Sequence, residues 1–399
     1  MRIGTANVYD NALEQLYKRQ SDMLTQQEQL SSGLRVNRAS DDPIAAAQAE
    51  RAMVRLSRIE TDQRALETQR SALSTAEAGL GEALGRMQDL RELVIAAGNA
   101  GYTESDRTTL AQQISNLRDQ IFAIANRTDS NGVPLFGGLG STGSPFADIP
   151  AGVQFQGAPG QRAASTTALP GAMNGQAIWM DVPSGNRSFE VSLADANTGG
   201  VWTDTGTVVS PTLLTGHDYS ISFTVIAGVT TYDVLNTSTG APTNPVLIGQ
   251  PYTSGAPIQF DGLSVLPQGA PASGDTVTIA PSTPLNIFNL LDGTINSINN
   301  ASSDNRLSQA IALSLAQIDT GMERLQAARG QAGDWLNRAD SITDAQSARS
   351  LALESDRSRA VDADMAKAIS NFTTAQTGYQ AALQSYAQIQ RLSLFNYIN

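Results

Sequence analysis

Cysteine and histidine are almost missing from the chain, and their scarcity removes several classes of site. None of the 399 residues is cysteine, and His217 is the single histidine. Without thiols the chain can form neither a disulfide nor a thiolate metal site, and one imidazole cannot build a histidine cluster for zinc. We therefore predict no bound metal, and no cofactor.

Aromatic residues, lysines and long apolar runs are also scarce. Aromatics make up 6% of the chain, and Lys18 and Lys367 are its only lysines. Cores poor in aromatics consist of Ala, Leu, Ile and Val, which favours helix-on-helix packing over a large pocket. A net charge of −12 repels phosphate backbones and anionic lipids, and no segment reaches the ~20 apolar residues of a membrane helix. Neither nucleic acid nor a membrane is expected as a partner.

Proline is almost absent from two of the three compositional blocks. Of the 16 prolines, only Pro43 and Pro134 lie outside the central block. Residues 1–136 and 285–399 are rich in Ala, Leu, Gln, Arg and Glu, whereas the segment between them is rich in Gly, Pro, Thr, Ser and Val. Because proline disrupts helix interiors, we predict an α+β fold. A long coiled-coil-like helical bundle built from both termini would carry an inserted antiparallel β domain.

A seven-residue apolar repeat in the first block predicts a long helix with one buried face. The repeat runs without a break through Ile59, Leu66, Leu73, Leu80, Met87 and Val94. Asp42 can accept hydrogen bonds from the first free N–H groups, and Pro43 suits the first helical position. Gly98 is a natural stop. The predicted helix is about 55 residues long.

The two ends of the chain carry thinner apolar stripes, which predict an assembly interface between terminal helices. Its members are Leu13, Leu16, Met23, Leu30, Met365, Phe372, Tyr379, Tyr386, Ile389, Leu394 and Phe395. An isolated helix pair of this kind gains little from apolar burial against the entropy of ordering it. We expect both ends to be poorly ordered in the monomer and to fold when copies assemble.

Together these patterns predict five segments. They are an N-terminal terminal helix (1–42), N-terminal rod helices (43–137), an inserted β domain of one or two subdomains (138–284), a C-terminal rod helix (285–349) and a C-terminal terminal helix (350–399).

Several short motifs are similar to those of the flagellin-like family. Residues 31–35 (SSGLR) and 39–43 (ASDDP) resemble the N-terminal signature of flagellins and their relatives at the hook–filament junction. The opening residues 2–5 (RIGT) and the closing residues 392–398 (LSLFNYI) resemble the junction members rather than flagellin itself. The resemblance covers both helical arms and is faint in the β block.

The resemblance implies a structural protein of the bacterial flagellum, in which the two terminal helices form an inner tube, and not an enzyme. Such subunits are exported unfolded by the flagellar type III apparatus, without a cleaved signal peptide, to the hook–filament junction outside the cell. The implied partners are further copies in a ring, hook-associated protein 1 (FlgK), flagellin, and an export chaperone (FlgN) on the C-terminal segment. Two other functions stay open: a flagellin that forms the filament itself, and a glycan-binding adhesin that acts through the β domain.

Four glutamines recur at every fourth position near the C-terminus. Gln376, Gln380, Gln384 and Gln388 form one row on a helix, opposite the aromatic stripe. A row of neutral amides would suit the wall of a channel that passes unfolded chains, because it neither attracts charge nor holds apolar segments. An ordinary solvated helix face explains the row equally well.

Three motifs admit a catalytic or cofactor-binding interpretation, and for each we favour a structural one. The glycines of residues 138–143 have dinucleotide-loop spacing but open no helix, which favours a linker. Asp41 and Asp42 directly precede Pro43 and are better explained as a helix cap than as a catalytic carboxylate pair. His217 lies in a Gly-His-Asp turn with no nucleophile motif nearby. No catalytic residue is therefore predicted.

Two further patterns admit a ligand. Residues 129–132 (DSNG) faintly resemble the start of a calcium loop, but Gly140 stands where the twelfth-position acid belongs. Trp179 and Trp202 could stack on a sugar, although tryptophans in a β domain more often belong to its core. We favour a turn and a core, respectively.

Overall fold

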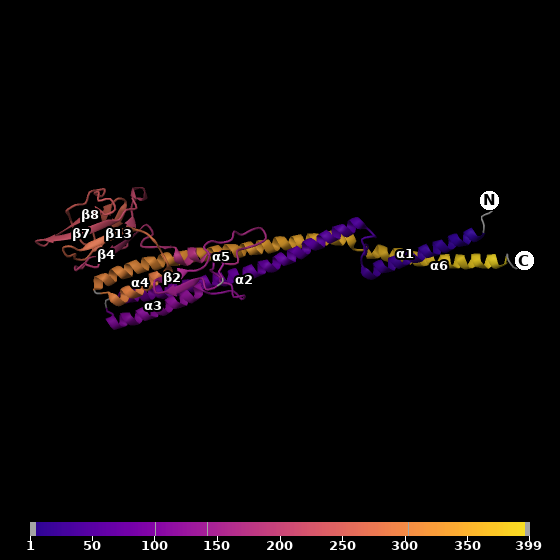
Figure 1. The fold of residues 1–399 in the computed structure, drawn as a ribbon, viewed down its shortest axis with the longest axis horizontal. Helices are drawn as coiled ribbons and strands as arrows, with labels where there is room; N and C mark the ends of the chain where they lie inside the picture. Colours follow the sequence, from indigo (N-terminus) through magenta and orange to yellow (C-terminus); the bar gives the residue numbers. More distant parts are fainter. Residues whose placement is uncertain (1–4, 100, 142, 302, 396–399) are drawn as a thin grey trace. The chain divides into compact units, whose positions relative to one another are not determined.

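The computed structural model describes residues 5–99, 101–141, 143–301 and 303–395. In sequence order, helices occupy both ends of the chain and a β region lies between them (Figure 1). The named strands pair antiparallel. The chain divides into two units. Unit 1 comprises Met1–Arg64 and Ser341–Asn399, and unit 2 comprises Ala65–Asp340. The predicted α+β fold with an inserted antiparallel β region is confirmed.

Unit 1 is helical. It contains α1 (Thr5–Ser32), α6 (Met365–Phe395), the start of α2 (Pro43–Ala97) and the end of α5 (Asp304–Val361). Figure 1 shows α1 and α6 side by side. At the start of α2 the Asp42 carboxylate accepts the N–H of Ala45 at 3.1 Å, which confirms the predicted cap.

The helical part of unit 2 buries the seven-residue stripe. From Leu66 to Val94 each member of the stripe on α2 is at most 2% exposed. Every seventh residue of α5 over the same stretch is apolar and buried as well: Ile318, Leu325, Ala332 and Ala339. Ion pairs join Arg91 to Asp319 and Arg70 to Asp340, so residue numbers rise along α2 as they fall along α5. The two helices are therefore antiparallel.

Two further helices complete this part of unit 2. They are α3 (Glu104–Ala125) and α4 (Ile287–Asn300). The predicted rod helix of residues 285–349 is two helices here, and α5 continues past residue 349 to Val361. A cap explains why α4 begins separately, because the Asn286 side chain accepts the N–H of Asn289. Asparagine and serine are weak helix formers, and several of them around residue 300 explain why α4 ends there.

The first β elements pack on the helices of unit 2. Strands β1 (Phe146–Ile149) and β2 (Gly152–Phe155) form a hairpin. The Asn289 side chain accepts the N–H of Val153, and the Asn286 side chain donates to the Val153 carbonyl. An aromatic cluster lies beneath the hairpin, and it comprises Phe136, Phe146, Trp179 and Phe288. The hairpin is thus anchored to α4 by both polar and aromatic contacts.

The remaining strands form what we call the outer lobe, from β4 to β13. Strands β3 (Val182–Pro183) and β14 (Pro284–Leu285) pair where the chain enters and leaves it. A five-stranded sheet has the order β4 (Phe189–Leu193), β13 (Thr276–Pro281), β7 (Tyr219–Ile226), β8 (Val229–Asn236) and β9 (Gln250–Pro251). The smaller sheets are β10 (Ile258–Phe260), β11 (Leu263–Val265) and β6 (Thr207–Val208), and β12 (Pro267–Gln268) with β5 (Trp202–Thr203).

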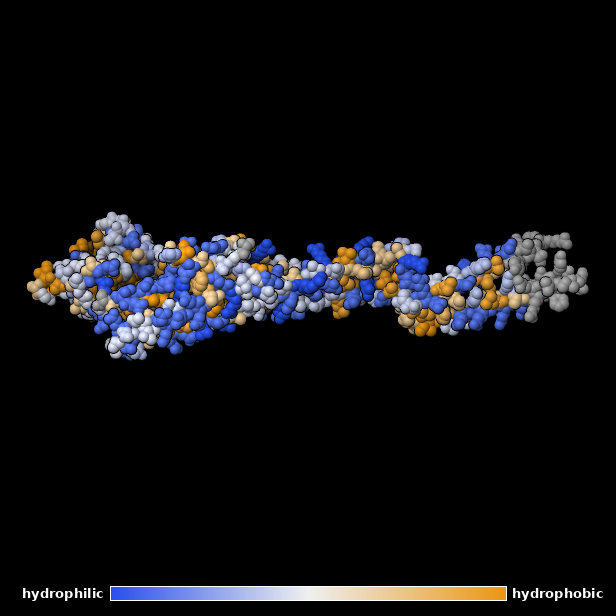
Figure 2. All heavy atoms as spheres, turned by 60° about the horizontal axis from the view of Figure 1, so that its bottom comes forward, coloured by the Kyte–Doolittle hydropathy of each residue, from blue (hydrophilic) through white to orange (hydrophobic). Residues whose placement is uncertain are grey.

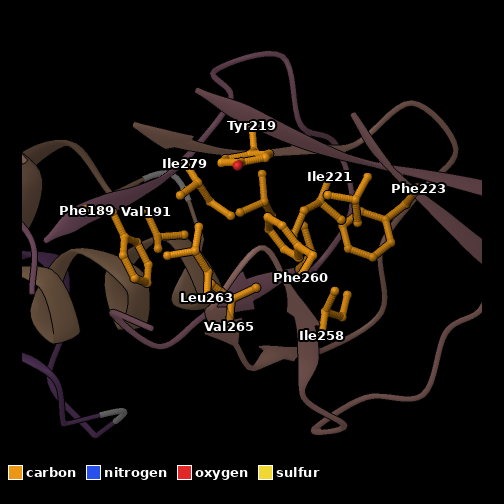
Figure 3. Close-up of a cluster of buried hydrophobic side chains, with 13 residues drawn as sticks. Phe189, Val191, Tyr219, Ile221, Phe223, Ile258, Phe260, Leu263, Val265 and Ile279 are labelled. Carbon is orange, nitrogen blue, oxygen red and sulfur yellow. The ribbon is translucent and has the colours of Figure 1, made fainter. Parts of the chain in front are cut away.

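The outer lobe has a hydrophobic core of its own. Figure 3 shows side chains of β7, such as Ile221, pointing toward those of β10 and β11, such as Phe260. Tyr219 lies at the edge of this core and donates its hydroxyl to Asp261 at 2.8 Å. Burial, together with the Asp261 carboxylate, raises the pKa of Tyr219 to about 12. The phenol therefore stays protonated and keeps this hydrogen bond.

Arg118 of α3 joins three elements of unit 2. Its guanidinium donates to Asp292 of α4 at 3.1 Å and to Asp148 of β1 at 2.5 Å. It also lies over the rings of Phe122 and Phe288. Burial disfavours the charged guanidinium, but the hydrogen bonds to Asp148 and Asp292 outweigh that effect and raise the pKa of Arg118. This side chain thus links α3, α4 and the β1–β2 hairpin.

Replacing Arg118 with methionine should destabilise unit 2. The Arg118 side chain is 8% exposed, whereas both acceptor carboxylates are about 40% exposed and can regain water. We expect a loss of about 2 kcal/mol in urea unfolding, between the ~3–5 kcal/mol for breaking a fully buried pair and the ~1 kcal/mol or less for an exposed one. Arg91→Met is the matched control, because Arg91 and Asp319 are 40% and 47% exposed. It should cost under about 1 kcal/mol, and equal losses would contradict the assignment.

Candidate assembly surface

The paired terminal helices carry most of the predicted interface. Leu13, Leu16, Met23 and Leu30 of α1 are half-buried, as are Phe372, Tyr379 and Tyr386 of α6, whereas Met365 is exposed. The side chains of Ile389, Leu394 and Phe395 lie outside the described residues. Among the described side chains of α1 and α6, only Ala368 is fully buried. One copy of the chain therefore leaves this apolar seam incompletely covered.

Unit 1 also exposes apolar side chains that the sequence patterns missed. They are Tyr17, Leu24, Ile44, Met53, Val54, Leu351, Ile369 and Leu383. Two of them, Ile44 and Leu351, are 72% and 70% exposed. These residues lie beside the heptad positions rather than on them, so a search for a single stripe passes over them. Together with the half-covered α1–α6 seam, these side chains form apolar area that another copy could cover.

The loop between α1 and α2 is held against the end of α5. The N–H groups of Arg35 and Val36 donate to the Val361 carbonyl, and the N–H of Ala363 donates to the Gly33 carbonyl at 2.9 Å. Gly33 adopts φ +70°, a left-handed conformation that ends α1. A small apolar core backs these bonds: Val36, Ala45, Ala49, Ala360 and Val361. The signature motif therefore fixes the turn from α1 into α2.

Both carboxylates of the Asp41–Asp42 pair are engaged in this turn. The backbone N–H of Arg38 donates to Asp41 and lowers the pKa of that carboxyl. The N–H of Ala45 and then the Arg35 guanidinium lower the pKa of Asp42 in the same way. Each carboxylate is ionised and already has its partners, which is the arrangement of a helix cap.

Charge is divided unequally between the two units. In unit 1 the lysines and arginines equal the aspartates and glutamates in number, so the entire net charge of −12 belongs to unit 2. A neutral helical unit can approach identical copies without a large electrostatic cost, whereas a strongly acidic unit resists close packing. Unit 1 therefore combines exposed apolar side chains with a charge balance that allows copies to pack closely.

The four glutamines of α6 are exposed. Gln376, Gln380, Gln384 and Gln388 are all exposed. The row does not lie wholly opposite the aromatic stripe, because Gln376 follows Phe372 by four residues and so lies one turn along the same side of the helix. Exposure is expected both of a channel wall and of an ordinary solvated face. The channel interpretation stays a prediction.

The other candidate residues are part of the scaffold. Trp179 is fully buried and stacks on Phe288, so the hypothesis that it binds a sugar is wrong. Trp202 is half-buried. His217 is linked through its Nδ1 to the Asn236 amide at 2.8 Å. The Asp129 carboxylate accepts the N–H groups of Asn131 and Val133 and closes a turn.

Within the described residues, no group of His, Cys, Asp or Glu has the arrangement of a metal site. No described helix is both long enough and apolar enough for a transmembrane span.

Two family models match the helical arms. The bacterial flagellin N-terminal helical region matches residues 3–141, and the bacterial flagellin C-terminal helical region matches residues 315–398. Together they cover more than half of the chain, in the order and at the ends that the motifs indicate. The chain belongs to the flagellin family. The segment between the two matches contains the outer lobe, so family membership rests on the helical arms.

Curated relatives include both junction proteins and filament proteins. This flagellin-family chain is 34% identical over 150 residues to flagellar hook-associated protein 3 of Salmonella typhimurium, covering 37% of the chain and 46% of the relative. It is 36% identical over 140 residues to flagellin of Bacillus subtilis, covering 35% and 46%. The chain thus matches about half the length of these relatives.

Solved structures agree over a larger share of the fold. The flagellar junction protein FlgL from Legionella pneumophila matches with a TM-score of 0.69 and 28% identity, covering 74% of this flagellin-family chain and 99% of that structure. FlgL from Xanthomonas campestris matches with a TM-score of 0.67 and 22% identity, covering 73% and 99%. The second likeness is one of fold alone.

Limited proteolysis of the purified monomer should trim both ends first. The incompletely covered α1–α6 seam predicts frequent local opening, so cleavage within residues 1–42 and 365–399 should precede cleavage within unit 2. A protease of broad specificity is needed, because residues 188–305 contain no lysine or arginine for trypsin. Mass spectrometry of early fragments checks the order. Ends that resist as long as the outer lobe would contradict the expectation that they fold on assembly.

Proposed function

We propose that the chain is a structural, non-enzymatic subunit of the bacterial flagellum that joins the hook to the filament. Copies would form a ring that contacts hook-associated protein 1 on one side and flagellin on the other. The observation that carries this proposal is the α1–α6 pair, whose apolar seam one chain leaves half-covered. Membership of the flagellin family and the likeness to solved FlgL structures support it.

Unfolded export fits the make-up of the chain. A chain without cysteine cannot be trapped by disulfides before or during passage through an export channel. Individual helices form within about a microsecond once the chain is released. An export chaperone (FlgN) on the C-terminal segment would cover the α6 stripe while no partner copy is present. The same stripe, led by Phe372 and Tyr379, would then pass to neighbouring subunits.

A filament subunit is the alternative, because flagellins also match the helical arms. The opening residues 2–5 and the closing residues 392–398 favour the junction role. Stoichiometry separates the two in sheared filaments, where a junction subunit is a minor component and a flagellin is the bulk.

A strain lacking this chain should keep its hooks, lose its filaments and release flagellin into the medium. Flagellin would be exported but would find no ring to grow on. Loss of a filament subunit would instead leave no flagellin in the medium. Electron microscopy of cells and blotting of culture medium measure both. Filaments that persist in the deletion strain would refute the junction role.

A matched pair of variants then tests the seam itself. Met23→Asp places a charge among half-buried apolar side chains, whereas Gln20→Asp places it on the exposed side of the same helix. Both proteins should be exported, but only Gln20→Asp should restore filaments to the deletion strain. Equal restoration by the two variants would argue against the α1–α6 seam as the assembly surface.

The exposed glutamine row suggests a second role for α6. We infer that Gln376, Gln380, Gln384 and Gln388 line the channel through which later subunits pass. Amide side chains are neutral and hydrated, so an unfolded segment can slide past them without strong binding. All four glutamines are exposed, so within one chain the row is free to face such a lumen.

Replacing the four glutamines with leucine should slow flagellin export, because an apolar wall would retain apolar segments of the passing chain. The rate of flagellin appearance in the medium measures the effect. The control places leucine at Thr374 and Ser385, which are exposed on α6 but off the row. Unchanged export in the row variant, or equal slowing in the control, would refute the channel role.

A further inference from the structure

The tip of the β7–β8 hairpin is unusually apolar for an exposed turn. Ile226 pairs with Val229 at the end of the ladder, and these two side chains are 71% and 62% exposed. Ala227 and Gly228 form the turn with φ of +51° and +80°. Two-residue turns of this kind ordinarily use Asn-Gly or Asp-Gly. Figure 2 shows hydrophobic side chains at the end of unit 2 where Figure 1 places this hairpin.

An apolar groove lies elsewhere on the same unit. It has a volume of about 300 Å³ between α2, near Gln69 and Ala72, and the loops of residues 129–141 and 162–172. Leu139 and Val133 line the groove, and their side chains are 52% and 50% exposed. The groove can accept a pair of branched aliphatic side chains. Its exposed leucine and valine gain nothing from water and would be covered by such an insertion.

The hairpin and the groove of one chain lie apart. Figure 1 places β7 and β8 at one end of unit 2, away from the middle of α2 where the groove lies. An apolar projection and an apolar recess at different places on one surface can form the two halves of a head-to-tail contact between copies. In such a contact each chain would offer one half to one neighbour and the other half to the next.

The groove is lined by one acidic side chain, Asp129, which is engaged in its own turn, and by one basic side chain, Arg162, which is opposite in charge to the acidic lobe. Residues 188–305, which include the outer lobe, contain no lysine or arginine. Arg162 at the groove is the only basic residue of segment 128–186, and it has no ion-pair partner among the described residues. On β8, four residues from Val229, Asp233 uses one carboxylate oxygen for the N–H of Gly249. Its other oxygen is available to a guanidinium of a neighbouring copy.

We propose that the β7–β8 tip of one copy inserts into the groove of the next copy, with Ile226 and Val229 covered by Leu139 and Val133. Arg162 of the receiving copy faces the acidic lobe that delivers the tip. The contact is distinct from the α1–α6 seam, and it gives the outer lobe a role in linking neighbouring subunits. It holds for any assembly of the chain and so does not depend on the junction role.

The absence of cysteine permits a direct test on the full-length chain. Ala227→Cys and Leu139→Cys are made in separate chains, mixed and oxidised under conditions that allow assembly. We expect a disulfide-linked pair that contains one chain of each kind, identified by mass spectrometry. Val246→Cys mixed with Leu139→Cys is the matched control, because Val246 is an exposed apolar residue of the same lobe, 55% exposed. A control pair that links as readily would overturn the proposal.

Charged substitutions give a second, independent measurement. Ile226→Asp with Val229→Asp removes the tip, and Leu139→Asp removes the groove; both changes are at exposed positions. Each variant alone should self-associate at least tenfold more weakly than the wild type in analytical ultracentrifugation. Mixing them should recover one contact, because an intact tip then meets an intact groove. A mixture no stronger than either variant, or a wild type that associates no better than the tip variant, would refute the contact.

Discussion

The packing of α2 against α5 is the contact on which the rest of unit 2 depends. These helices lie more than two hundred residues apart in sequence, yet Arg91 reaches Asp319 at 2.7 Å and Arg329 reaches Glu77 at 2.6 Å. The exposed ion pairs contribute little energy, and most of the stabilisation comes from the fully buried stripe between them. Because the two arms meet, everything between them must leave and return at nearly the same place. The pairing of β3 with β14 is that return.

Sequence patterns predicted the features that depend on local periodicity. The seven-residue stripe, the Asp42 cap and the alternation along Tyr219–Ile226 each follow from side-chain spacing within one segment. The boundaries of α4 were harder to predict, because its start depends on a cap at Asn286 and its end on residues with only weak helix preference. Period alone could not separate two helices whose apolar faces follow one another.

Contacts between segments distant in sequence could not be predicted from the sequence. Arg118 lies among other charged residues of α3, and its acceptors are 30 and 174 residues away. Nothing in the local pattern marks it as buried. The exposed apolar residues of unit 1 were missed for the opposite reason, since Ile44 and Leu351 look like ordinary members of amphipathic helices. Only the fold reveals that no described element of the chain covers them.

The incompletely covered surfaces explain how one chain can be both stable and ready to assemble. Unit 2 owes its stability to buried stripes, the Arg118 link and a closed β core, none of which a partner needs to complete. Unit 1 has no net charge and leaves apolar area exposed, and only other copies can cover that area. Exposed apolar area costs about 25 cal/mol per Å², and a subunit recovers that free energy only on assembly. An outer lobe without lysine or arginine adds repulsion between lobes, which favours contacts at defined apolar points over broad adhesion. Assembly is therefore specific because the net negative charge belongs to unit 2, whereas unit 1 has no net charge and exposes apolar area that other copies can cover.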